Sequence, residues 1–155
     1  MGITQEITME ELIEKMKVVL ASTFAAKLKA HGYHWNVTGS DFPQLHEFFA
    51  TIYEDYDGAI DPLAEHIRQL GAFAPATLSR MSELSVIEQD ETIPNAVKMV
   101  ANLQTCNENL MNTVIEAYEM AEEQKDYGLS NYLQDRITAH KKLNWMLEAT
   151  MGKKP

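Results

Sequence analysis

Two histidines and two carboxylates in the first half of the 155-residue sequence are spaced like ligands of a metal ion. His34 and His46 flank residues 36–40, whose sequence Asn-Val-Thr-Gly-Ser favours a turn, so the two imidazoles should lie close together. Asp61 and Glu65 are four residues apart, which places both carboxylates on one face of a helix. Two imidazoles with carboxylate oxygens suit Fe(II) and leave coordination positions open for an oxidant.

A single chain cannot bring all four groups to one ion. His46 and Asp61 are 15 residues apart on one expected helix, and a rise of 1.5 Å per residue separates them by about 22 Å. A ligand atom must lie about 2 Å from its metal ion. A second copy packed antiparallel, with a two-fold axis near Glu54 and Asp55, would complete two equivalent sites from both chains. Two-fold contacts are the commonest interface of oligomers.

Ordinary structural explanations exist for the same residues. Neighbouring helix carboxylates often form a solvated face, and a single histidine is more often structural than a ligand. The sequence contains no Glu-x-x-His, and Ala50 stands where a second histidine would complete His-Glu-x-x-His. These absences argue against a di-iron site in the centre of a helical bundle and against a zinc protease.

Apolar residues recur at helical spacing over nearly the whole chain, which predicts an all-α fold. Four long helices are typical of a four-helix bundle, and a long connection containing a short extra helix is typical of ferritin-like topologies. The sequence shows no internal repeat or linker, so we expect one domain over residues 1–155. The expected segments are a first helix from about 8 to 35, a second from about 42 to 70, a short helix at 77–84, a third from about 92 to 124 and a fourth from about 129 to 150.

Side-chain caps predict where these helices begin, because a Ser, Thr or Asp side chain can accept hydrogen bonds from free amides at a helix N-terminus. Pro62 predicts a kink inside the second helix. Leu28 and Val97 are expected on buried faces because both continue an apolar stripe. The expected caps are Thr8 with Glu11, Asp41 with Gln44 and Pro43 in the next turn, and Thr92 with Pro94 in the next turn.

The composition limits the compartment and the partners. Lys and Arg number 13 and Asp and Glu number 23, so the formal charge of −10 repels nucleic acid. The one cysteine, Cys106, cannot form an intrachain disulfide and fits a reducing compartment. No apolar run approaches the roughly 20 residues of a membrane span, and the first residues lack a signal-peptide pattern. We therefore expect a cytoplasmic protein that does not associate with a membrane.

Three segments of the sequence resemble the Dps-type mini-ferritins, the DNA-binding proteins from starved cells. These segments are HGYHWNVTGSDFPQLHEFF, DPLAEHIRQLGAFAP and AHKKLNWML. The resemblance covers nearly the whole chain and implies a ferritin-like bundle that assembles from two-fold dimers into a hollow dodecamer. It also implies ferroxidase activity, in which Fe(II) is oxidised, preferentially with hydrogen peroxide, and stored as ferric mineral that protects against oxidative stress.

The resemblance also assigns residues by position. His34 and His46 correspond to the histidine ligands of iron, and Asp61 and Glu65 correspond to the carboxylates that the partner chain supplies. Trp35 corresponds to a tryptophan that serves as an electron donor or radical trap, although a core aromatic residue with a polar handle would explain it equally well. The resemblance assigns no role to His31.

Two departures from the resembled family carry expectations of their own. Many family members have an aspartate that helps to hold a second iron where this chain has Ala50, so we expect one firm iron site and a weak or water-supported second site. DNA-binding members often carry a basic terminal arm. Here no Lys or Arg precedes Lys15, and the C-terminus offers only Lys153 and Lys154. DNA binding at physiological salt should therefore be weak.

Acidic residues at the end of the third helix and early in the fourth have two explanations. The resemblance implies acidic three-fold pores that draw iron inward, and Asp126 and Asp135 are candidates for such a pore. Solvated charge at a helix end is the alternative. Two other functions also remain open for the chain: a DNA-compacting or structural shell protein without ferroxidase activity, and a bundle that binds zinc or another divalent metal without oxidising it.

Overall fold

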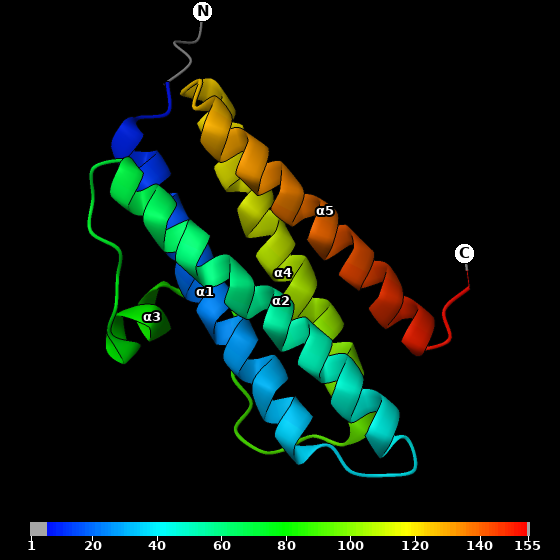
Figure 1. Ribbon diagram of the computed structural model, residues 1–155. Helices are drawn as coiled ribbons and strands as arrows, with labels where there is room; N and C mark the ends of the chain where they lie inside the picture. The colour runs from blue at the N-terminus through cyan, green and yellow to red at the C-terminus, as the bar shows by residue number, and fades with distance from the viewer. Residues whose placement is uncertain (1–5, 155) are drawn as a thin grey trace, which may run out of the picture.

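The computed structural model describes residues 6–154, and within this range every regular element is a helix. Four long helices form a bundle, and one short helix lies in the connection that crosses the bundle (Figure 1). The all-α fold predicted from the sequence, with an extra helix in the crossover, is confirmed. The elements in chain order are α1 (Met9–Asn36), α2 (Phe42–Gln69), α3 (Leu78–Leu84), α4 (Ala96–Glu123) and α5 (Tyr127–Thr150).

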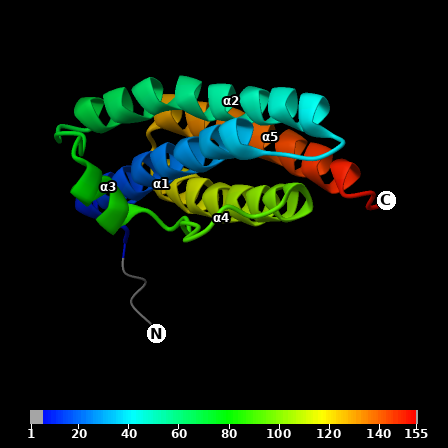
Figure 2. The ribbon, with the colours of Figure 1, turned by 90° about the horizontal axis from the view of Figure 1, so that it is seen from below.

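The long helices pack as two antiparallel pairs. A short turn joins α1 to α2, and another joins α4 to α5, so each pair lies side by side along its length. The connection between α2 and α4 spans the bundle, so these two helices run in the same direction (Figure 1). Seen from below, α1 lies between α2 and α4, with α3 against it at one end (Figure 2). None of the described helices combines the length and the apolar character needed to cross a membrane.

The core consists of apolar side chains that recur at three- and four-residue intervals on each long helix. Each large side chain that is removed from water contributes roughly 1.5–3 kcal/mol. Side chains of α1 and α2 are buried on both sides of the turn that joins these helices. Their packing determines how the two helices face each other, and therefore the positions of the residues near the turn. The largest fully buried side chains include Leu12, Met16 and Leu20 of α1, Phe49, Ile52, Tyr56, Leu63 and Ile67 of α2, Met99, Leu103 and Leu110 of α4, and Leu129 of α5.

The cap of α1 is as the sequence predicts, but two other caps differ. The Thr8 side chain accepts a hydrogen bond from the amide of Glu11, whose own side chain bonds back to the Thr8 amide. Asp41 precedes α2 but makes no side-chain cap bond, because its ψ of 15° lies outside the extended region that a capping side chain normally needs. The predicted cap at Thr92 is wrong. Asn95 caps α4 instead, because its side chain accepts a hydrogen bond from the Lys98 amide.

Two residues that were expected in the core lie on the surface. Leu28 is 47% exposed because the buried face of α1 runs through Ala25, Lys29 and Tyr33 at this point. Val97 is 78% exposed and lies in the first turn of α4, before the buried face of that helix begins at Met99. The apolar pattern identified the helices correctly, but it did not fix their rotation at these positions.

Helix α2 continues without interruption through Pro62, and its buried face extends beyond the proline to Ile67. An interior proline removes one backbone hydrogen bond and crowds the carbonyl four residues earlier. That carbonyl belongs to Gly58, and the space beside Gly58 is open. The proline is therefore accommodated inside the helix, and Asp61 and Glu65 remain on the same element as His46.

Candidate metal centre

His34 in the last turn of α1 and His46 in the second turn of α2 lie face to face. Their ring centroids are 3.7 Å apart and their planes differ by 15°. Each Nδ1 lies 2.6 Å from the backbone carbonyl oxygen of the other histidine. The turn between the helices therefore brings the two imidazoles together, as the sequence predicts, and a reciprocal pair of hydrogen bonds fixes both rings.

These hydrogen bonds determine which nitrogen of each ring is free. A carbonyl oxygen can only accept a hydrogen bond, so both Nδ1 atoms must carry hydrogen and donate. A neutral imidazole protonated at Nδ1 keeps its lone pair at Nε2. Metal-ligating histidines typically donate their second ring N–H to a carbonyl or carboxylate, which orients the ring. The arrangement therefore leaves the Nε2 atom of each ring as the nitrogen that could act as a ligand.

Two aromatic residues that the sequence did not single out support the histidine pair. Phe42 stacks on the ring of His46, with centroids 4.9 Å apart and planes that differ by 26°. Tyr53 contacts His34 edge-on at 5.3 Å. Tyr53 follows His46 by seven residues, which places both on one face of α2. That spacing was the signal in the sequence that could have identified Tyr53.

His31 and Trp35 extend the same cluster of rings. His31 stacks on Tyr53 with centroids 3.9 Å apart and planes within 17°, and Trp35 lies 4.2 Å from His31. Burial lowers the pKa of His31, and the nearby charge of Lys27 lowers it further, which favours the neutral imidazole. Trp35 is 58% exposed, so it is not a core residue of this chain.

Asp61 and Glu65 lie on the exposed surface of α2, away from the histidine pair. The ion pairs found within residues 6–154 involve other carboxylates. The helix is continuous between His46 and Asp61, so its rise separates them by about 22 Å. Over residues 6–154, no three His, Cys, Asp or Glu side chains of the one chain are placed to hold a metal ion.

The carboxylate of Asp55, midway along α2, already has a partner. Arg136 on α5 donates to both of its oxygens, at 3.2 and 2.8 Å, in a bidentate pair. The Arg136 side chain is 10% exposed and the Asp55 side chain is 42% exposed, so the pair lies at the edge of the core. Asp55 therefore joins α2 to α5, and its carboxylate is not free to act as a metal ligand.

The centre of the bundle contains a chain of polar side chains rather than carboxylates. Tyr56 donates to Asn107 Oδ1 at 2.9 Å, and His140 Nδ1 lies 2.8 Å from the same oxygen. Asn107 donates in turn to the carbonyl oxygen of His140 at 2.8 Å. Burial lowers the pKa of His140 to about 3, and the charge of Arg136 adds to the effect. This network satisfies its own hydrogen bonds and offers no carboxylate to a metal ion.

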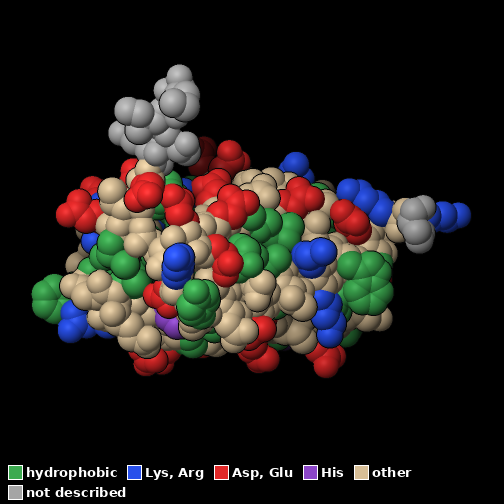
Figure 3. All heavy atoms as spheres, turned by 90° about the horizontal axis from the view of Figure 1, so that it is seen from above, with side chains coloured by type: hydrophobic (Ala, Val, Ile, Leu, Met, Phe, Trp, Pro, Cys, Tyr) green, Lys and Arg blue, Asp and Glu red, His purple; other side chains and the backbone are tan. Residues whose placement is uncertain are grey.

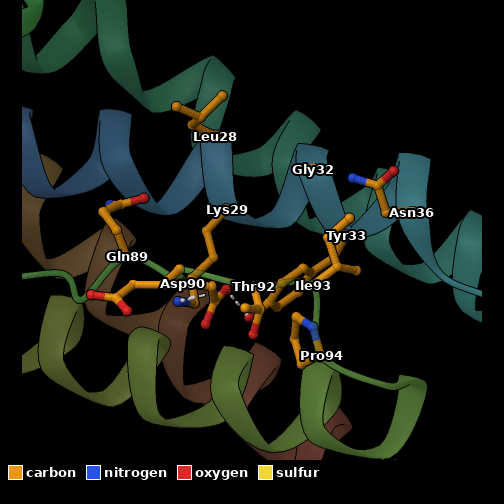
Figure 4. A pocket seen from close by; sticks show the side chains of 11 residues that line it. Leu28, Lys29, Gly32, Tyr33, Asn36, Gln89, Asp90, Thr92, Ile93 and Pro94 are labelled. Carbon is orange, nitrogen blue, oxygen red and sulfur yellow. Dashed lines mark hydrogen bonds and ion pairs between the residues drawn. The ribbon is translucent and has the colours of Figure 1, made fainter.

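The cavity drawn in Figure 4, with a volume of about 210 Å³, lies between α1 and the connection that leads to α4. Lys29 donates to the Glu88 carbonyl at 2.8 Å and pairs with Asp90 at 3.3 Å. Tyr33 donates to the same Asp90 carboxylate, and Asn102 donates to the Tyr33 hydroxyl at 3.1 Å. These bonds join three segments of the chain, so the cluster explains how the connection is held in place.

The two candidate pore residues have different surroundings. Asp126 caps α5, because its carboxylate accepts a hydrogen bond from the Leu129 amide at 3.1 Å. Asp135 is exposed on α5. A three-fold pore requires neighbouring copies of the chain, so the role of both residues remains a prediction.

Comparisons with known proteins agree with this architecture. The family described as the ferritin-like domain matches residues 13–154. The DNA protection during starvation protein of Helicobacter pylori is 32% identical over 140 residues, which cover 90% of this chain and 97% of that protein. The protein of the same name from Brevibacillus brevis is 31% identical over 146 residues, which cover 91% of this chain and 98% of that protein.

A solved structure has the same fold. The crystal structure of the Dps protein of Vibrio cholerae O1 superposes with a TM-score of 0.88 at 26% identity, covering 97% of this chain and 99% of that one. That protein is described as a member of a broad superfamily of ferritin-like diiron-carboxylate proteins. The chain belongs to the ferritin-like family, and its relatives place it among the Dps proteins of that family.

Proposed function

We propose that this chain oxidises Fe(II) at a centre shared between two copies and that an assembly of copies stores the ferric product as mineral. Iron is both the substrate and the cargo in this proposal. The observation that carries it is the reciprocal bonding of His34 and His46, which leaves a lone pair on the Nε2 of each of two rings stacked 3.7 Å apart. Within residues 6–154 no further His, Cys, Asp or Glu side chain is placed to join this pair on a metal ion, so we assign the remaining protein ligands to a second copy.

Asp61 and Glu65 of that second copy are the best candidates for the missing ligands. They are exposed, neither forms an ion pair within residues 6–154, and they lie one turn apart on the helix that carries His46. Two copies of α2 packed antiparallel would place the carboxylates of each chain beside the histidines of the other. Carboxylate oxygen balances the positive charge of iron and favours the ferric product, which is a harder ion than Fe(II).

Hydrogen peroxide is the proposed oxidant. It accepts two electrons, so hydroxyl radical is avoided only when both electrons are delivered together. The exposed ring of Trp35 lies within the aromatic cluster of the site and is a candidate electron donor. Acidic residues such as Asp126 and Asp135 would line pores that draw iron into a hollow shell of twelve copies. Ferric ions formed at the centre then move inward and form mineral, and the shell works in the cytoplasm.

Protection of DNA, for which two of the relatives are named, would follow here from removing Fe(II) and peroxide. The chain has a formal charge of −10. Acidic side chains are spread over the face in Figure 3, whereas several Lys and Arg side chains gather toward the end with the C-terminus. A shell of such chains repels the phosphate backbone, so binding to DNA at physiological salt should be weak.

The first test measures storage and assembly together. The protein is loaded with Fe(II) without oxygen, treated with stoichiometric peroxide and separated by size-exclusion chromatography, and iron is assayed across the peak. Ferric iron that elutes with a particle near twelve subunits supports the proposal. A particle free of iron would favour a structural shell, and Fe(II) that is bound but not oxidised would indicate a metal-binding bundle without oxidase chemistry.

A second test asks whether the centre is shared. One variant lacks both histidines (His34→Ala with His46→Ala) and another lacks both carboxylates (Asp61→Ala with Glu65→Ala). Each variant alone should be inactive, and random co-assembly should restore about a quarter of the intact sites, because half of the dimers are mixed and each mixed dimer has one complete site. Glu91→Gln, in the exposed connection before α4, serves as a control. Failure to restore activity would exclude a shared centre.

A further inference from the structure

The histidine pair belongs to a continuous run of rings that joins α1 to α2. Each ring contacts the next with centroids between 3.7 and 5.3 Å apart, and the run ends at a tryptophan that is 58% exposed. Stacking and edge contacts of this kind hold aromatic side chains in defined positions. In order of contact, the rings are Phe42, His46, His34, Tyr53, His31 and Trp35.

Tyr53 holds a special position in this run because it is the one phenol among these six rings. Its ring touches His34, a proposed iron ligand, at 5.3 Å, and it stacks on His31 at 3.9 Å. The side chain of Tyr53 is partly buried, whereas Trp35 beyond it is exposed. An oxidisable side chain therefore lies between the proposed iron site and the surface.

The ligand set of the proposed centre creates a need for such a side chain. Two histidines and two carboxylates are enough for one iron ion, and the next position on the same face of α2, one turn after His46, is Ala50, which offers no ligand atom. One Fe(II) supplies one electron, but peroxide needs two to become water. The second electron must come from another donor close to the site.

We propose that Tyr53 supplies this second electron when a single Fe(II) occupies the centre, an inference that rests on the proposed function. In that step Fe(II) becomes Fe(III), and the Tyr53 phenol loses one electron and its hydroxyl proton to become a tyrosyl radical. The O–O bond of hydrogen peroxide breaks, and with that proton and one more from solvent its two oxygens leave as two water molecules. No hydroxyl radical is released.

His31 is a positioning residue for Tyr53 in this scheme. Its ring stacks within 17° of the Tyr53 plane, and it also contacts Trp35. The stack fixes the phenol ring beside His34 and provides a path by which the oxidised state can pass to the exposed indole. External reductants can then restore the chain from the surface.

The experiment uses the assembled protein loaded without oxygen with one Fe(II) per chain. Excess peroxide is added, the samples are frozen within seconds, and electron paramagnetic resonance spectra are recorded. The unmodified chain is compared with Tyr53→Phe, which keeps the ring but removes the hydroxyl. Tyr127→Phe is the matched control because Tyr127 is 73% exposed at the start of α5, outside the cluster. Fe(III) formation and spin-trapped hydroxyl radical are measured in the same samples.

The expected result is a tyrosyl signal in the unmodified chain and in Tyr127→Phe, and its loss in Tyr53→Phe with a several-fold rise in trapped hydroxyl radical. His31→Leu should retain Fe(III) formation but lower the yield and change the line shape of the tyrosyl signal. Fe(III) formation without a tyrosyl signal, or with an equal signal in Tyr53→Phe, would overturn the inference and leave the proposed function standing. If the unmodified chain forms no Fe(III), the proposed function fails and this inference fails with it.

Discussion

Two hydrogen-bonded histidine sites lie at different depths of the same bundle. Where the end of α1 meets the start of α2, the half-buried rings of His34 and His46 each donate from Nδ1 to a backbone carbonyl. In the centre of the bundle, His140 is 1% exposed and its Nδ1 donates to the side chain of Asn107. In both places a hydrogen bond fixes the ring and its tautomer.

Because both sites contain histidine, the difference in what the rings can do comes from how deeply each ring is buried in the bundle. Burial holds the pKa of His140 at about 3, so this ring stays neutral over the physiological range and acts as a structural donor. The rings at the end of the bundle are reachable from solvent, and backbone carbonyls satisfy only one nitrogen of each. An ion can approach the other nitrogen, which is why we assign chemistry to this end and structure to the centre.

The largest effect is expected from His46→Gln. This substitution removes one Nε2 ligand and breaks the reciprocal bonding with His34, so the rate of Fe(II) oxidation should fall by at least about 100-fold. The unfolding free energy should change by less than about 1.5 kcal/mol, because one partly exposed hydrogen bond is lost. Stopped-flow absorbance of ferric products and urea denaturation at a fixed protein concentration measure the two quantities.

A histidine on the same helix provides the control for that substitution. His66 is half-buried on α2 and stacks on Tyr132 with centroids 5.1 Å apart, outside the proposed centre. His66→Gln should leave the oxidation rate within about two-fold of the unmodified chain. Equal losses of rate in both variants would mean that histidines on α2 act through the fold, and the contrast between the two regions would disappear.

His140→Leu should show the opposite pattern. The change removes one of the two donors to the buried Asn107 oxygen, which still accepts from Tyr56, and losing one hydrogen bond costs about 0.5–1.5 kcal/mol. We expect the unfolding free energy to fall by that amount, while the oxidation rate per folded chain stays unchanged. A large loss of rate in a folded His140→Leu protein would place the bundle centre in the chemistry.

The pH dependence of stability should also separate the two regions. Unfolded histidine has a pKa near 6.5, while the folded pKa of His140 is lowered to about 3, so the unfolded chain binds a proton that the folded chain excludes. Stability from this group is complete above about pH 6.5 and is lost progressively as the pH falls toward 3. The loss approaches about 1.4 kcal/mol per pH unit.

Denaturation curves of the unmodified chain and of His140→Leu, measured between pH 5 and 7, isolate this contribution because most carboxylates titrate at lower pH. The unmodified chain should lose stability over this range more steeply than the variant. Parallel curves would show that His140 takes up its proton in the folded state without cost.

The sequence predicts the long helices and the meeting of His34 with His46 because both depend on local patterns. Apolar spacing defines the helices, and a short turn must bring its two ends together. The separation of His46 from Asp61 along a helix is likewise a matter of rise per residue. These inferences need no knowledge of how one helix rotates against another.

The features that the sequence missed depend on that rotation. Tyr53 of α2 reaches His31 and His34 of α1 only because the two helices meet at a particular angle, and the same rotation puts Leu28 on the surface. Phe42, by contrast, stacks on His46 within α2 itself, four residues along the same helix. The burial of Asn107 and His140 is also tertiary, since polar residues on a helix more often face water. The cap at Asn95 rather than Thr92 reflects a choice between two suitable residues that only packing decides.

At the end of the bundle that carries His34 and His46, the smallest effect on stability and activity is expected from a substitution that adds a carboxylate. Ala50 is half-buried one turn after His46, so an Ala50→Asp side chain would reach toward the proposed centre. The number of Fe(II) ions bound per chain in an anaerobic titration should rise from one toward two, with little change in stability. Thr51→Asp, on an exposed neighbouring position, should leave the number at one.

The same kind of substitution in the bundle centre completes the comparison. Ala59 on α2 is 2% exposed, and a carboxylate placed there would lose its hydration, which is costly for a charged group. Ala59→Asp should therefore unfold or strongly destabilise the chain, whereas Ala50→Asp is tolerated and gains a metal ion. If Ala50→Asp were as destabilising as Ala59→Asp, the end of the bundle would be closed to ions, and the centre proposed there would have no route for its substrate.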